Sequence, residues 1–270
     1  MYLAIKEIER IHFETTNACN LHCVFCSRTN KINNEGKIHI KHVTLEETKK
    51  WLPKGILPNL KIIKYCGNYG DFPNNPYIFE ITEYLNSIGI KITGNTNGGS
   101  RKPDWWYQFG KLQTSINWSI DGLSDTVGIY QRGAAFKKSI KNAEAYIKGG
   151  GEAKWNFVVF EHHEHQIKEA EKIAFDIGFK KFSVRIGHRF NNKENNIQPS
   201  NLFKKFTNNK DNVDKNLLEI NCRFRNQKEI FINNYGDVVP CCYISDFQNK
   251  SAKGYRDYYR IIKKYGNEFL

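Results

Sequence analysis

The stretch Cys19-Asn20-Leu21-His22-Cys23-Val24-Phe25-Cys26 places three cysteines on one short segment, with three residues and then two between them. It follows an apolar run at residues 11–16 that predicts a buried strand. Three thiolates this close together can ligate three irons of a cubane cluster and leave the fourth iron open. Zinc is the main competing metal, but structural zinc usually takes four protein ligands in two spaced pairs. The stretch therefore predicts an iron–sulfur cluster with one open coordination position.

Apolar runs and helical patterns alternate from residue 11 to about residue 187, as is typical of repeated βα units around a parallel sheet. Several of the apolar runs are nearly continuous, which favours strands buried on both faces. We expect strands at 11–16, 61–67, 91–96, 115–121, 153–160 and 180–187. A capping box at Thr44 and Glu47 predicts a helix that ends at Pro53. Further helices are expected at 76–88, around Trp105 and Trp106, at 135–148 and at 165–177.

The cysteine triad, with aromatic Phe25 directly before its last cysteine, resembles the signature of the radical S-adenosylmethionine (SAM) superfamily. The resemblance implies an α/β fold, a partial (β/α)6 barrel of the TIM type. It also implies a [4Fe-4S] cluster on Cys19, Cys23 and Cys26 that reductively cleaves SAM to a 5′-deoxyadenosyl radical, which takes a hydrogen atom from the substrate. The electron would come from a donor such as flavodoxin or ferredoxin.

Other positions match those that bind SAM in this family, and they lie at the carboxyl ends of predicted strands, where barrel active sites are built. A glycine-rich turn at 67–71 ends in Asp71, to which the resemblance assigns the SAM amino group. Arg132 stands where relatives carry an arginine that reaches the SAM carboxylate, a task that suits a guanidinium fork. The full set of SAM-binding residues that the resemblance implies is Phe25, Gly67, Asn68, Tyr69, Gly70, Asp71, Asn97, Ser119, Asp121 and Arg132.

The run Glu161-His162-His163-Glu164-His165 superficially suggests a metal site. Relatives commonly carry asparagine where His163 stands, so a contact of this residue with SAM is not implied. We expect these histidines to form a solvated entry to a helix.

The C-terminal part carries a second cysteine pattern. Cys222 is followed after thirteen residues by Gly236, and after four more by Cys241 and Cys242, which resembles the opening of a SPASM or Twitch extension. No cysteine follows Cys242, so a full SPASM domain with two clusters is excluded. Two alternatives stay open. One is an auxiliary cluster on Cys222, Cys241 and Cys242, either with a further side chain such as Asp246 as ligand or with an open iron for substrate; the other is a hairpin that has kept its shape without metal. Cys66 is expected to be a buried thiol.

The organisation we expect is a core barrel at 1–190, a connector rich in Asn and Lys at 191–216, and the Twitch-like extension at 217–270. In the extension, Asn234-Tyr235-Gly236 predicts a β-hairpin, and residues 253–264 predict an amphipathic helix.

Lysine and arginine outnumber aspartate and glutamate by 41 to 28, which gives a net charge of +13. This favours anionic partners, including nucleic acid, although cations spread along the whole chain are also what a general compositional bias produces. The first residues do not resemble a signal peptide, and no apolar run approaches the roughly 20 residues that span a bilayer. We therefore predict a cytoplasmic enzyme, with no membrane partner, that acts on a peptide or small polar substrate. The alternatives are modification of a nucleic acid or nucleotide, and a non-catalytic iron–sulfur protein.

Overall fold

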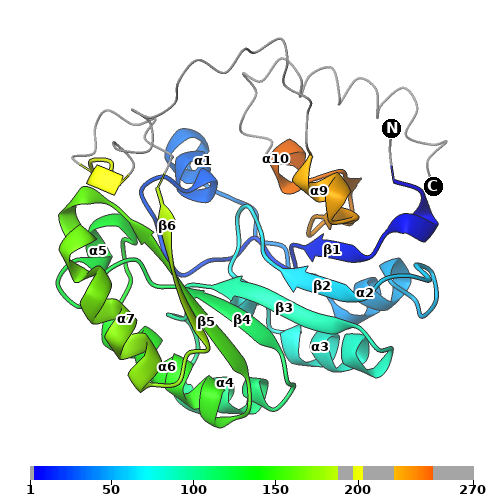
Figure 1. Ribbon diagram of the computed structural model, residues 1–270. Helices are drawn as coiled ribbons and strands as arrows, with labels where there is room; N and C mark the ends of the chain where they lie inside the picture. Colours follow the sequence, from blue (N-terminus) through cyan, green and yellow to red (C-terminus); the bar gives the residue numbers. More distant parts are fainter. Residues whose placement is uncertain (1–2, 188–196, 203–221, 246–270) are drawn as a thin grey trace.

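A curved sheet forms the centre of the computed structural model, which describes residues 3–187, 197–202 and 222–245 (Figure 1). Its strand order is β6-β5-β4-β3-β2-β1-β7-β8, and every neighbouring pair is parallel except the antiparallel pair β7 and β8. In the described part β6 and β8 form the two edges, so the sheet is open. The strands are β1 (Arg10–Phe13), β2 (Ile62–Tyr65), β3 (Lys91–Thr96), β4 (Ser115–Ser119), β5 (Glu152–Val159), β6 (Lys181–Ile186), β7 (Glu229–Ile232) and β8 (Val238–Val239).

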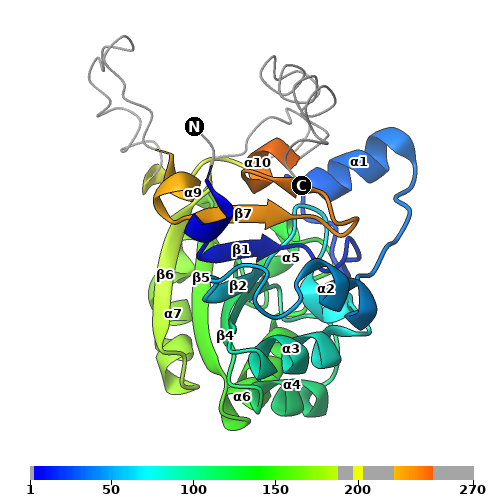
Figure 2. The ribbon, with the colours of Figure 1, turned by 90° about the vertical axis from the view of Figure 1, so that its right-hand side faces the viewer.

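Most of the helices cover the outer, convex face of the sheet, as Figures 1 and 2 both show. Those that follow β2 to β5 alternate with the strands, as a parallel sheet requires. The helices are α1 (Ser27–Glu35), α2 (Leu45–Trp51), α3 (Ile78–Ser87), α4 (Pro103–Gly110), α5 (Val127–Tyr130), α6 (Phe136–Lys148), α7 (Ile167–Asp176), α9 (Arg223–Asn226) and α10 (Cys242–Ser245). Short 3-10 turns lie at η1 (Ile5–Glu7), η2 (Phe72–Asn74) and η3 (Glu161–Gln166).

The two faces of the sheet differ in chemistry, and this difference positions the site. Alternate residues of the strands point outward into one core with the helices, in which Trp106, Trp118 and Trp155 are completely buried. The residues between them, including Asn95 and Asn117, face inward and are mostly polar and partly exposed. The concave face therefore presents polar groups.

The predicted fold class is confirmed: the chain is an α/β protein with an open, mainly parallel sheet. The capping box is also confirmed, because Thr44 accepts from the backbone N–H of Glu47 while Glu47 accepts from the N–H of Thr44. The strand at 11–16 ends three residues earlier than expected, because the chain turns away from β2 to form the cysteine segment.

The predicted hairpin is present as β7 and β8, and β7 pairs in parallel with β1, so the hairpin continues the sheet of the core. Both expected domain boundaries, at residues 190 and 216, and the expected helix at 253–264 lie outside the described residues. Within the part that is described, no helix is long and apolar enough to cross a membrane.

Candidate functional site

The cysteine triad lies at the carboxyl edge of the sheet, on the segment between β1 and α1, and Cys26 caps the start of α1. Two backbone hydrogen bonds tie this segment to the end of α5 and to the chain that follows it. The N–H of His22 donates to the carbonyl oxygen of Arg132 (3.0 Å), and the N–H of Val24 donates to that of Tyr130 (3.0 Å). The structure therefore brings Arg132 next to the cysteines, as the predicted site requires.

Asn97, at the end of β3, links the predicted SAM-binding acid to the triad. Its Nδ2 lies 2.7 Å from Oδ2 of Asp71, 3.1 Å from Oδ1 of Asn20 and 3.8 Å from Sγ of Cys19. The hydroxyl of Thr96 also donates to Oδ2 of Asp71 (3.1 Å). The ends of β2 and β3 and the cysteine segment thus meet through hydrogen bonds at one point.

The glycine-rich turn after β2 needs two of its glycines for space. A Cβ atom on Gly70 would lie 1.8 Å from the backbone oxygen of Thr16, and one on Gly67 would lie 2.4 Å from Oε1 of Glu14. The same Glu14 oxygen accepts from the backbone N–H of Tyr69 (2.8 Å). Because the turn is pressed against the end of β1, Asp71 is held beside the cysteine segment.

Burial dominates the electrostatics of these groups. It raises the pKa of Asp71 to about 7, and the hydrogen bonds from Thr96 and Asn97 offset only part of this effect. Burial, followed by the nearby charge of Asp71, raises the pKa of Cys19 to about 12. The pKa of Cys23 is also raised well above its usual value, by burial and then by Cys26 and Cys19. In the metal-free chain these two thiols hold their protons, so a metal has to displace them.

Ser119 and Asp121, at the end of β4, lie among hydrogen bonds that hold the site together. Oδ1 of Asp121 accepts from the backbone N–H of Val158 (2.8 Å), and burial raises the pKa of this carboxyl to about 7. Gln131 donates to the carbonyl oxygen of Ser119 and accepts from the N–H of Asp121. Sequence reasoning missed Gln131, although it directly precedes Arg132.

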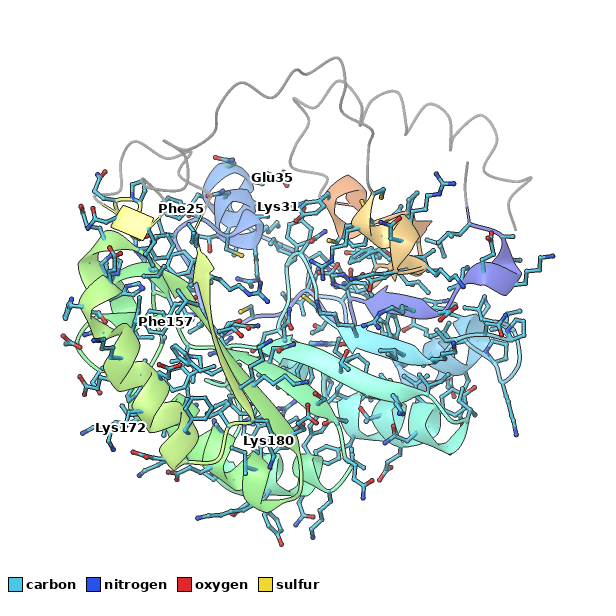
Figure 3. All side chains as sticks on the ribbon, in the orientation of Figure 1. Phe25, Lys31, Glu35, Phe157, Lys172 and Lys180 are labelled. Atoms are coloured by element: carbon cyan, nitrogen blue, oxygen red, sulfur yellow. The ribbon has the colours of Figure 1, made fainter. Side chains whose placement is uncertain are left out.

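Phe25 is buried in a small aromatic cluster beneath the cysteine segment. Its ring centroid lies 6.0 Å from that of Tyr130 and 6.1 Å from that of Phe160. Figure 3 shows Phe25 beside α1, near the carboxyl edge of the sheet. The ring therefore packs the triad segment against β5 and α5.

Arg28, in the first turn of α1, is a second residue that sequence reasoning missed. It is only 8% exposed, its Nε donates to the carbonyl oxygen of Asn17 (3.2 Å), and its Nη1 has no hydrogen-bond partner among the described residues. Its charge lowers the pKa of Cys19. The available sequence signal was a cation two residues after the last cysteine.

The expected solvated helix entry at 161–165 is wrong for His163. This side chain is fully buried, and its ring packs edge-on against Phe157 and Phe160. Burial lowers the pKa of His163 to about 4, so the ring is neutral. It is a packing residue, in the 3-10 turn η3 that follows β5.

The triad fits a cluster better than a single ion. Nowhere in the described part are three His, Cys, Asp or Glu side chains close enough together to hold one metal ion. A cubane needs less convergence, because each thiolate binds a different iron atom. The three cysteines share one segment, and Cys19 and Cys23 are largely shielded from water. The charge of Cys26 raises the pKa of both, and that of Cys19 raises the pKa of Cys23.

Fold and site together define a partial TIM barrel with a three-cysteine segment at the carboxyl edge of its sheet. Residues 13–176 match the family model described as the radical SAM superfamily, and the chain belongs to that superfamily. A comparison with curated protein sequences finds no match.

Solved structures with the same fold include SuiB of Streptococcus suis bound to S-adenosylmethionine. It is 15% identical with a TM-score of 0.63, and the match covers 87% of this chain and 60% of SuiB. Another is anSMEcpe with bound AdoMet and the Cp18Cys peptide, 17% identical with a TM-score of 0.58, covering 86% of this chain and 73% of anSMEcpe. The chain thus spans about three fifths of SuiB, and at these identities the likeness shows the fold.

Proposed function

We propose that the chain binds a [4Fe-4S] cluster through Cys19, Cys23 and Cys26, and SAM at the cluster's open iron. When bound, the reduced cluster supplies the electron that cleaves SAM and so yields the radical that takes a hydrogen atom from the substrate. The observation that carries this proposal is the contact of Asn97 with both Asp71 and Cys19. It joins the predicted ligand segment and the predicted SAM acid in a single site.

The chain's own groups have separate tasks in this proposal. The carboxylate of Asp71 accepts hydrogen bonds from the SAM ammonium group, and Asn97 orients this carboxylate. Arg132 pairs with the SAM carboxylate. The turn beneath SAM consists of Gly67, Asn68, Tyr69 and Gly70. The end of β4 contributes Ser119 and Asp121 to the SAM pocket. Phe25 and its aromatic neighbours exclude water from the cluster side of the site.

The substrate in this proposal is a peptide or a small polar molecule. The inner face of the sheet supports it, because Asn117 donates to Asn95, and Lys154 donates to Ser115, across neighbouring strands. SuiB has been solved with the precursor peptide SuiA, and anSMEcpe with the Cp18Cys peptide. We place the electron donor in the class of flavodoxins and ferredoxins.

We also propose that residues 217–270 form a Twitch-type extension, joined to a core at 1–190 through a connector at 191–216. The β7–β8 hairpin and α10, which starts at Cys242, support this division. The cysteine spacing before and after the hairpin supports it as well.

The test is anaerobic iron–sulfur reconstitution of the full chain, followed by reduction with SAM and measurement of 5′-deoxyadenosine. The proposal expects release of this product by the parent chain and none by Cys23→Ala. Cys222→Ala is the matched control, because it removes a cysteine outside the triad. Product release by Cys23→Ala at the parent rate would overturn the proposal.

The net charge of +13 favours a second candidate, modification of a nucleic acid. This hypothesis predicts that the chain binds RNA or DNA with an affinity that falls steeply as salt is added, because each neutralised phosphate releases counterions. Affinity that stays flat between about 50 and 200 mM salt would dismiss it.

A further inference from the structure

Arg28 is a buried cation that spans the cysteine segment. It lies in the first turn of α1, two residues after Cys26, which caps that helix. Its side chain reaches back along the chain, because its Nε donates to the carbonyl oxygen of Asn17 (3.2 Å), two residues before Cys19. This one hydrogen bond joins the two ends of the segment that carries all three cysteines. The guanidinium group therefore lies along the same segment as the thiols.

Both ends of this link are held in place. Nδ2 of Asn17 donates to the carbonyl oxygen of His39 (2.8 Å), and Oδ1 of Asn17 accepts from the backbone N–H of Lys41 (2.8 Å). Asn17 and Arg28 are both buried. Because neither end can move into solvent without breaking these bonds, the guanidinium group has little freedom to turn toward water.

Part of the guanidinium group has no partner in the protein. Among the residues that the structure describes, Nη1 of Arg28 is buried and makes no hydrogen bond. A charged donor that is buried without a partner is costly, and native structures leave few such groups unexplained. The orphaned Nη1 therefore points to a bound anion as its missing partner.

The other charges that act on the thiols are negative. The charge of Asp71 raises the pKa of Cys19, and that of Asp121 raises the pKa of Cys23, whereas Arg28 lowers the pKa of Cys19. A guanidinium group does not lose its proton in a protein, so the charge of Arg28 is permanent. In a buried place water screens this charge only weakly. Arg28 is thus suited to balance negative charge that is bound by the triad.

We propose that Arg28 supplies the positive charge that offsets the negative charge of the cluster on Cys19, Cys23 and Cys26, and that it thereby raises the reduction potential of this cluster. The inference rests on the cluster proposed above. Reduction adds one electron from the flavodoxin- or ferredoxin-type donor, so the negative charge of the site grows by one. A buried cation favours the reduced state, since net charge and hydrogen bonds to the sulfur atoms are among the factors that set such potentials.

The test is a redox titration of the reconstituted full chain, followed by EPR, with and without SAM. Arg28→Gln removes the charge but keeps an amide that can donate to Asn17. We expect the equilibrium constant for one-electron reduction to fall about tenfold in this variant, which lowers the potential by about 59 mV. Arg28→Lys keeps the charge and should restore most of the potential. Lys37→Gln is the matched control, because it removes the same charge from an exposed position shortly after α1, and it should leave the potential unchanged.

The two substitutions at Arg28 separate a role of its charge from a role in folding. Equal potentials in the parent and in Arg28→Gln would overturn the proposal. So would a change in SAM affinity alone, or a loss of iron in both variants, which would indicate a structural role. Iron that is lost in Arg28→Gln and restored in Arg28→Lys would support the proposal.

Failure of this inference is distinct from failure of the proposed function. A parent chain that assembles no cluster would overturn both. A parent chain that releases 5′-deoxyadenosine, with no difference in potential between it and Arg28→Gln, would overturn only the role of Arg28.

Discussion

The affinity for SAM should depend steeply on pH because of Asp71. This carboxyl is 5% exposed, and burial raises its pKa to about 7. Only the ionised form attracts the SAM ammonium group, so binding lowers the pKa of Asp71 and is tight above pH 7. From pH 8 to pH 6 the ionised fraction falls from roughly nine tenths to roughly one tenth, and the Kd should rise roughly tenfold. At pH 6 binding should release close to one proton.

Anaerobic titration calorimetry of the reconstituted chain at several pH values measures both the Kd for SAM and the number of protons released on binding. Asp71→Asn keeps the shape of the side chain and removes its charge. It should weaken binding roughly 10-fold to 100-fold at pH 8, the loss of a hydrogen bond to a charged group, and it should flatten the pH profile. Asp121 also has a raised pKa, so Asp121→Asn tests which carboxyl causes the slope. An unchanged slope in Asp71→Asn would refute the reasoning.

Three further changes test other parts of the structure. Gly70→Ala places a Cβ against the backbone oxygen of Thr16 and should cost about 1–3 kcal/mol in urea unfolding, whereas Gly128→Ala meets no atom within 4 Å and should be close to neutral. Trp118→Ala empties a fully buried core position and should cost about 3–5 kcal/mol; a loss below 1 kcal/mol would contradict the packing described. His163 has its pKa lowered to about 4, so its contribution to stability is present above pH 6.5 and is lost as pH falls toward 4. His163→Asn should therefore remove roughly 2 kcal/mol of the parent's loss of stability between pH 7 and pH 5, measured on the metal-free chain.

The sequence allowed the local elements to be predicted where the apolar periodicity was clear or where capping residues marked the end of a helix. The apolar runs located the core strands, and Thr44 with Glu47 located the start of α2. Helix α1 was missed because Ser27–Glu35 has no apolar face to reveal it, although Gly36 closes it in the left-handed conformation. Its place is set by the cysteine segment that precedes it.

The contacts between distant segments could not be predicted in the same way. The hairpin signal at residues 234–236 was local and was found, but the pairing of β7 with β1 depends on a partner far away in the chain. The roles of Arg28 and Gln131 became visible only once the fold placed Arg28 against Asn17, and Gln131 against Ser119 and Asp121.

The central claim is that three thiolates leave one iron open for SAM. The most direct test is the EPR spectrum of the reduced cluster, recorded before and after SAM is added, in a variant that keeps the triad and has alanine at Cys222, Cys241 and Cys242. The account predicts a cubane signal that shifts on addition of SAM. A signal indifferent to SAM, or a closed zinc site with no iron, would contradict it.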